Sequence, residues 1–279
     1  MKRPHRAGIS SEGDSQLAKP AVKTEVTTTK APTPPATLTP SAAPAFLTKY
    51  EEHRGRGVSY AAEDRLVPFI RLLQPGSPEL KPKNEKFVRE AEMGDIYFKN
   101  RSPEIIKADE GIIVQPCAYQ KSWVEWVPRA KGGGFVARHD KRPSDTEERP
   151  NPEDPTKVRL YRKSTGNEVI ETRYEYVRYR GAPYVISFTS TGHTVWKEWN
   201  EIMINLSGKD ASFARLYKLT PKLRTRNEYE WFVYTVEDAG WVTSEDEYLE
   251  GAKLEESVRS GLKVADEDVH DEEATESRI

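Results

Sequence analysis

Aromatic and charged side chains alternate along several short stretches of this chain, and a period of two is the pattern of a β-strand. Tyr174, Tyr176 and Arg178 alternate with Arg173 and Glu175. Successive side chains of a strand point to opposite faces, so the first three would share one face and the last two the other. Because similar stretches recur between residues 94 and 237, the sequence predicts a mainly β fold.

Two segments have the pattern of helices instead. Residues 193–208 carry apolar side chains at helical spacing, and Gly208 would end that helix. Ser244 and Glu247 form a capping-box pattern, which would begin a second helix over residues 245–259.

The predicted strands, joined to these two helices, indicate a fold class. We expect strands at residues 94–99 and 111–129, two around a turn at 164–167, one at 183–191, and a hairpin of 211–219 with 227–237. Many strands with one or two helices predict an α+β, mainly β fold, and our first choice is a small OB-like β-barrel.

Three segments are less regular. Residues 66–73 would form an edge strand or a broken helix, because Pro68 interrupts the apolar run. Residues 84–93 resemble a brief helix. Residues 131–155 would form a long polar loop, and loops of that length are usually functional or mobile.

The two ends of the chain differ from its middle. Residues 1–45 are rich in Pro, Thr and Ala and hold almost no large apolar side chains, so we expect a disordered tether. Residues 46–260 would form the OB-like domain. Residues 261–279 would form a disordered acidic tail.

Charge is segregated along the chain, although its net value is only −2. Residues 237–279 carry fifteen acidic and four basic side chains, a net of −11, whereas the rest carries 39 basic and 30 acidic side chains, a net of +9. A basic body favours a polyanionic ligand. The acidic end could compete for the same surface or engage a basic partner protein.

The motifs of common enzyme classes are missing. The five histidines have no metal-ligand spacing, and the sequence has no nucleophile elbow and no phosphate-binding loop. The single cysteine, Cys117, rules out an intrachain disulfide. We therefore expect no catalytic residues, no metal and no cofactor, with an enzyme whose site is assembled from distant residues as an alternative.

No apolar run is long enough to span a membrane, and the N-terminal residues have no signal-peptide core. Together with the lone cysteine, this predicts a cytoplasmic protein without membrane contact.

Aromatic and basic side chains occur together in four segments. Single-stranded nucleic acid needs cations for its phosphates and flat rings on which unpaired bases stack. The candidate DNA-binding residues are Trp123, Trp126, Arg129, Lys131, Phe135, Arg138, Tyr161, Arg162, Lys163, Arg173, Tyr174, Tyr176, Arg178, Arg180, Lys222 and Arg224.

Two interpretations of the rings remain open. They could form a stacking surface, or they could fill the inside of the barrel while the arginines face solvent. Trp196 and Trp199 are assigned to helix packing. Residues 131–142, with three consecutive glycines, would form a mobile basic flap over a strand lying on Trp123 and Trp126.

Several segments resemble a known family. "LVPFIRLLQPGSPE", "GDIYFKN" and "VQPCAYQKSWVEWVPR" are similar to a family of tailed-phage and prophage proteins often encoded beside replication and recombination genes. A barrel followed by an acidic tail is also similar to phage single-stranded-DNA-binding proteins, whose tails commonly end in an apolar residue that docks on partner enzymes. Here Arg278 precedes the terminal Ile279, which departs from that pattern.

The expected function is therefore binding of single-stranded DNA in phage replication or recombination, without strong sequence preference. Phage replication enzymes could bind through the acidic tail, and the chain could form a homodimer. The alternatives are a phage structural or assembly protein, whose aromatic strands would form subunit interfaces, and a replication-associated nuclease with a divergent site. The resemblance also implies that the predicted compartment is the bacterial host cytoplasm.

Overall fold

The computed structural model describes residues 66–99, 104–128, 131–151, 157–208, 210–226 and 229–264, together with Lys49, Glu52, Arg56 and Gly57. Contacts divide the chain into two units, Met1–Arg56 and Gly57–Ile279. Every strand and helix named below belongs to the second unit. The predicted tether lies outside the described residues, as does the tail beyond residue 264.

Strands dominate the second unit. They are β1 (Leu66–Val67), β2 (Phe69–Leu72), β3 (Ile96–Phe98), β4 (Glu104–Ile106), β5 (Ile112–Trp126), β6 (Phe135–His139), β7 (Thr146–Pro150), β8 (Val158–Arg162), β9 (Glu168–Tyr179), β10 (Ala182–Phe188), β11 (Arg215–Arg226), β12 (Tyr229–Trp241) and β13 (Lys263–Val264). The helices are α1 (Gly192–Ser207) and α2 (Glu245–Arg259), with 3-10 turns η3 (Pro78–Leu80) and η5 (Ser212–Ala214).

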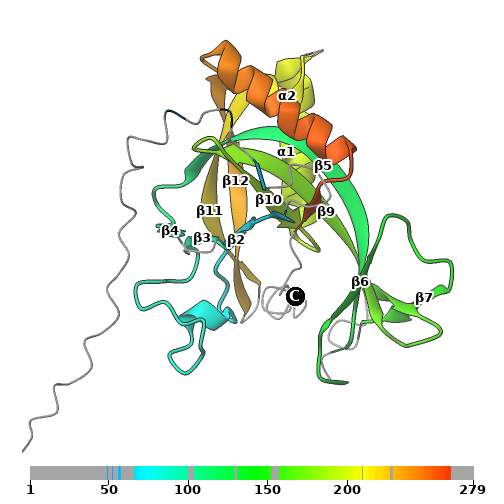
Figure 1. Ribbon diagram of the computed structural model, residues 1–279. Helices are drawn as coiled ribbons and strands as arrows, with labels where there is room; N and C mark the ends of the chain where they lie inside the picture. Colours follow the sequence, from blue (N-terminus) through cyan, green and yellow to red (C-terminus); the bar gives the residue numbers. More distant parts are fainter. Residues whose placement is uncertain are drawn as a thin grey trace, which may run out of the picture. The chain divides into compact units, whose positions relative to one another are not determined.

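Most of these strands form one curled sheet, a half-barrel (Figure 1). Its order is β12-β11-β5-β9-β10-β2-β3-β4, and β6 and β8 attach to the far ends of β5 and β9. Neighbours pair antiparallel, except for the parallel pair of β10 and β2. The mainly β class with two helices is confirmed.

The inner face of the half-barrel holds the main core, and α1 packs against it. Trp199 of α1 is fully buried and contacts Phe188 and Tyr217 edge-on, with ring centroids 6.2 and 5.9 Å apart. The strands contribute mostly alternate apolar residues, as a half-buried sheet requires. The fully buried members from the strands are Ile70, Ile96, Phe98, Val114, Val177, Ile186, Tyr217 and Leu219.

A bulge changes which side chains β5 turns inward. Ile112 and Val114 face the main core before it. Between Pro116 and Ala118 the pairing with β9 shifts by one residue. After the bulge, the odd-numbered residues from Tyr119 onward face inward, because a one-residue shift exchanges the two faces of a strand.

The edge strand β12 meets the segments beside β2 and β3 through a side chain rather than a strand ladder. Gln74 follows β2, and its amide donates to the Phe232 carbonyl and accepts from the Phe232 N–H, both at 2.9 Å. Gly94 lies against the Phe232 ring, and a Cβ there would be 2.4 Å from a ring carbon. A pocket of about 50 Å³ remains beside this seam, between β2, β10, β12 and the start of α1.

The outer face of β5, β9 and β10 is covered by α2, β1 and β13 (Figure 1). Gln115 and Arg178 dock α2: the Gln115 amide donates to the Phe213 and Glu247 carbonyls, and Arg178 donates to the Gln115 amide oxygen and the Glu247 carbonyl. Gly251 permits the approach, since a Cβ there would be 2.7 Å from Gln115 Nε2.

Three local expectations differ from the structure. Residues 84–93 form turns rather than a helix, and the Asn84 side chain accepts from the Lys86 N–H, a local bond that competes with a helix. The expected loop at 131–155 contains β6 and β7. β11 continues to Arg226 through Pro221, which lies where β11 has parted from β5 and proline is tolerated.

The folded part also continues beyond residue 260, where the tail was expected to begin. Leu262 and Val264 are buried in the outer core, and β13 pairs with β1. The second helix matches its predicted bounds. Ser244 Oγ accepts from the Glu247 N–H at 3.1 Å, as the capping pattern requires.

Candidate functional site

A cluster of rings and cations lies on the inner face of β5 and β9, where the two strands extend past the first turn of α1. Tyr119 is 44% exposed, and its ring lies against that of Trp196, with centroids 4.6 Å apart and planes at 31°. The Arg173 guanidinium lies 4.6 Å from the Trp196 ring centroid. One exposed ring thus stands beside a second ring and a cation.

The cluster continues along the same two strands. Lys121 is exposed, and its ammonium group lies 5.3 Å from the ring centroid of the half-buried Trp123. Glu171 of β9 lies between the two cations: it accepts from Lys121 at 2.8 Å and from Arg173 at 3.1 and 3.2 Å. We call Tyr119, Lys121, Trp123, Arg173 and Trp196 the aromatic–cation strip.

A buried carboxyl supports the strip from beneath. Glu175 is buried and pairs across the sheet with Tyr119, and its Oε2 accepts from the Trp196 indole N–H at 3.0 Å. Burial raises the pKa of Glu175 to about 8, although the Trp196 hydrogen bond acts in the opposite direction. Glu175 is therefore mostly protonated and neutral at pH 7.

The pKa values of two other ionisable groups beside the strip, Glu171 and His193, are lowered, in contrast to that of Glu175. Burial alone would raise the pKa of Glu171, but the hydrogen bonds from Lys121 and Arg173 outweigh it and hold that pKa below its ordinary value. His193 donates to the Glu171 carbonyl, and burial followed by the charge of Arg173 lowers the His193 pKa. At pH 7 the strip thus has two cations, with one carboxylate and a neutral imidazole beside it.

A second basic region is the arm, the part of the β11–β12 hairpin beyond the pairing with β5 (residues 220–226 and 229–235). Lys222, Arg224 and Arg226 lie on one face of the arm and are exposed. Among the residues that the structure describes, none of the three pairs with a carboxylate. Alternate residues of a strand are about 7 Å apart, so the arm presents an evenly spaced row of cations.

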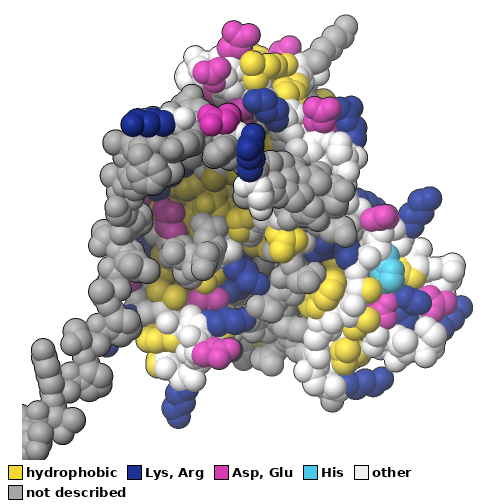
Figure 2. Space-filling model, viewed as in Figure 1, with side chains coloured by type: hydrophobic (Ala, Val, Ile, Leu, Met, Phe, Trp, Pro, Cys, Tyr) yellow, Lys and Arg dark blue, Asp and Glu magenta, His cyan; other side chains and the backbone are white. Residues whose placement is uncertain are grey.

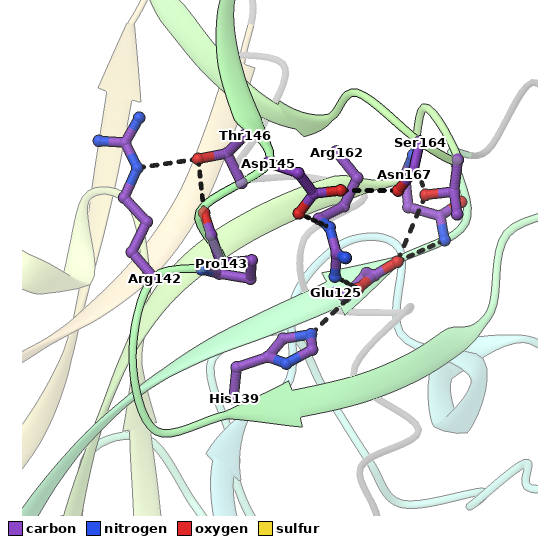
Figure 3. A network of polar contacts seen from close by, with 10 residues as sticks. Glu125, His139, Arg142, Pro143, Asp145, Thr146, Arg162, Ser164 and Asn167 are labelled. Carbon is purple, nitrogen blue, oxygen red and sulfur yellow. Dashed lines mark hydrogen bonds and ion pairs between the residues drawn. The ribbon is translucent and has the colours of Figure 1, made fainter.

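The residues between β5 and β9 form a small lobe, β6–β8 with the turn at 163–167, which is fastened by one carboxylate (Figure 3). Glu125 of β5 is buried and accepts from Arg162 at 2.7 Å, from Asn167 at 2.7 Å and from His139 at 3.0 Å. Asp145 holds the other side of Arg162 at 2.6 Å.

The contacts that fasten the lobe lower the pKa of Glu125 and occupy Arg162. Burial would raise the pKa of Glu125, but the hydrogen bonds from Asn167 and His139 and the charge of Arg162 hold it below its ordinary value. Arg162, a candidate binding residue, is thus committed to two carboxylates. Its role in the structure is to join β8 to β5.

The predicted basic flap, residues 131–142, is part of this lobe. Gly132, Gly133 and Gly134 all have positive φ and form the turn into β6, which pairs with β5. Lys131 and Lys163 are exposed at neighbouring turns. Figure 2 shows Lys and Arg mixed with Asp and Glu over the lobe, at the right of the view, instead of one basic patch.

Four of the predicted stacking rings are buried and cannot receive a base in this conformation. Tyr174 and Tyr176 are fully buried in the outer core, and Trp126 and Tyr161 are 3% and 8% exposed. Phe135 is half-buried, edge-on to Trp126 at 5.6 Å. Of the two interpretations left open by the sequence, these tyrosines follow the one in which the rings are buried in a core.

The remaining predicted cations are divided among several places. Arg138 lies over the Tyr174 ring at 5.0 Å, Arg178 docks α2, and Arg180 pairs with Glu104 at 2.8 Å. Arg129 lies outside the described residues. Of the sixteen predicted residues, the structure brings Trp123 and Arg173 together in the strip, and Lys222 and Arg224 together on the arm.

Sequence reasoning missed three members of the strip. Tyr119 and Lys121 precede Trp123 at intervals of two, so the alternation that placed Trp123 on one face also placed them there. Trp196 was assigned to the core together with Trp199. The structure separates them: Trp199 is fully buried, whereas Trp196 is half-buried against Tyr119.

In the described part of the chain, no group of three or more His, Cys, Asp or Glu side chains is arranged to hold a metal ion. No helix there is long and apolar enough to cross a membrane.

Comparison with known proteins identifies a family. Residues 36–263 match the model of a family described as Pam3 phage gp34-like protein. No curated protein matches the chain, and no solved structure does.

Proposed function

The chain belongs to the Pam3 phage gp34-like family, and we propose that it binds single-stranded DNA in phage replication or recombination. The observation that carries this proposal is the strip. Its rings are at least partly exposed, and two cations lie directly beside them. Stacking of one base on such a ring contributes about 1–3 kcal/mol and is tolerant of sequence.

The arm supports the same proposal. Lys222, Arg224 and Arg226 present positive charge along one strand, with no carboxylate partner among the described residues. Neutralisation of phosphates by such cations releases counterions, which makes the affinity fall as salt rises. The arm would supply phosphate contacts, and the strip would supply base contacts.

Strand order supports an OB-type barrel, and we include this in the proposal. β5, β9 and β10 follow one another antiparallel, α1 comes next, β11 pairs back with β5, and β12 pairs with β11. OB-folds bind oligonucleotides near strands 2 and 3, flanked by the loops after strands 1 and 4. The corresponding connections here are the β6–β8 lobe and the tip of the arm.

The chain would differ from other OB-folds in one respect. α2 and β13 cover the outer face of β9 and β10, so we place the ligand on the inner-face strip instead. Recruitment of replication enzymes by the acidic tail, and a homodimer, remain further parts of this proposal.

A matched pair of tyrosines tests the function. Tyr119 in the strip and Tyr248 on α2 are 44% and 39% exposed. Tyr119→Ala should weaken binding of oligo-dT about 5- to 150-fold, the equivalent of one lost stacking contact, whereas Tyr248→Ala should leave it unchanged. Quenching of tryptophan fluorescence by oligo-dT measures both. Equal affinities of the two variants, or no binding by the wild type, would reject the proposal.

A phage structural or assembly role is the second candidate. Trp241, Tyr248 and Leu249 are 51%, 39% and 45% exposed, and exposed aromatic side chains are common at subunit interfaces. Self-association that resists salt and is lost in Tyr248→Ala, measured by sedimentation, would favour this role. Binding of DNA that weakens steeply with salt would favour the first.

A further inference from the structure

Glu171 occupies the centre of the strip and holds both of its cations. It lies directly across the sheet from Trp123. One carboxylate oxygen accepts from Lys121 at 2.8 Å, and the other accepts from Arg173 at 3.1 and 3.2 Å. Lys121 and Arg173 are also the two cations that lie over the rings of the strip.

The other ionisable groups facing Glu171 add no charge to this group of two cations and one carboxylate at neutral pH. Glu175 is buried and neutral, because burial raises its pKa to about 8. His193, from α1, donates to the Glu171 backbone carbonyl and is neutral, because its pKa is lowered. Glu171 itself stays ionised, so it cancels one of the two positive charges.

This arrangement affects phosphates and bases differently. A phosphate that approaches Lys121 or Arg173 must displace the carboxylate or lie beside it, and like charges brought together in a binding surface are costly. A base that stacks on Tyr119 or Trp123 has no charge and meets no such opposition. Duplex DNA presents phosphates but keeps its bases stacked inside, so it can offer the strip only the opposed contact.

We propose that Glu171 is a specificity-determining residue, which suppresses phosphate-only contacts and so restricts the strip to unpaired bases. This inference rests on the proposed function and names its substrate class: single strands with accessible bases, discriminated against duplex DNA.

The test compares oligo-dT with duplex DNA of the same length, using the full chain. Glu171→Gln keeps the size of the side chain and removes its charge. It should raise affinity for duplex about tenfold and affinity for oligo-dT less than about threefold, because only the duplex depends on phosphate contacts at the strip. The slope of log K against log salt for duplex should steepen by about 1–2, at about 0.9 per additional phosphate contact.

Two further variants serve as controls. Glu171→Asp keeps the charge and should keep the wild-type preference for oligo-dT. Glu168→Gln, also on β9, removes a carboxylate paired with Arg159 at 3.4 Å outside the strip and should leave the preference unchanged. Unfolding midpoints close to that of the wild type would show that each variant is folded.

The outcomes separate this inference from the proposed function. If the wild type prefers oligo-dT and Glu171→Gln leaves the preference unchanged, the role of Glu171 is rejected and the function stands. If the wild type binds neither DNA and Glu171→Gln binds duplex, the role of Glu171 is supported and the proposed function is rejected. If neither protein binds either DNA, both are rejected.

Discussion

The two faces of the β5–β9 ribbon contain similar residues but have different surroundings. On the outer face, Tyr174 and Tyr176 lie beneath α2, β1 and β13 and are fully buried. On the inner face, Arg173 and Glu171 extend past α1 and stand beside the half-exposed Tyr119. Alternation of rings and charges is thus compatible with a core and with a binding surface, and elements far along the chain decide between them.

The largest expected difference between the faces is in stability. Tyr174→Ala should lower the free energy of unfolding by about 3–5 kcal/mol, because it deletes a buried ring and leaves a cavity. The ring packs near Phe69, with centroids 6.4 Å apart, and under Arg138. Tyr119→Ala should cost only about 1 kcal/mol, the contribution of one aromatic pair. Urea denaturation measures both, and similar losses would contradict the contrast.

A second prediction concerns the dependence of the unfolding free energy on pH, to which the buried carboxyl of Glu175 contributes. The pKa of Glu175 rises on folding from 4.5 to about 8. The folded state therefore binds more protons than the unfolded chain between these values. Stability from this group is fully present below pH 4.5 and is lost as pH rises toward 8, at up to about 1.4 kcal/mol per pH unit.

Glu175→Gln should remove that slope while keeping an acceptor for the Trp196 indole. The difference between wild-type and variant unfolding free energies, measured from pH 5 to 9, isolates Glu175 from His193, which both proteins contain. The lowered pKa values of Glu125 and Glu171 place their titrations below the window. Parallel curves for the two proteins would show that Glu175 is ionised in the fold.

The smallest predicted effect sharpens the description of the outer face. The Tyr176 hydroxyl donates to Gln120 Oε1 at 2.8 Å. Tyr176→Phe should cost about 1 kcal/mol of unfolding free energy, the net contribution of one hydrogen bond, and should leave the affinity for oligo-dT unchanged. A loss of oligo-dT binding by this variant would mean that the outer face also meets the ligand.

Local patterns predicted both helices and the faces of β9. The apolar spacing that ends at Gly208 gave α1, the Ser244 capping pattern gave α2, and alternation assigned Tyr174 and Tyr176 to one face of β9. These features depend on residues within a turn or two of one another, so the sequence contains the information directly.

Long-range features could not be predicted in this way. The docking of Gln115 and Arg178 on α2 joins residues 63 to 132 positions apart, and the Gln74 seam spans 158 positions. No period in the sequence indicates that α2 covers the outer rings. The strip was therefore only partly predictable: Trp123 and Arg173 followed from alternation, whereas Trp196 needed the position of α1.

The bulge at Cys117 adds one residue to β5 without adding a pairing position on β9. Pro116 and Ala118 pair with the consecutive β9 residues Val177 and Tyr176, so Cys117 is the extra residue. Deletion of Cys117 would restore uninterrupted pairing and leave Lys121 and Trp123 on the inner face, but each later residue would stand one position earlier in the chain. A comparison with a relative that lacks the extra residue would therefore match residues from opposite sides of the molecule unless it placed a gap at this point.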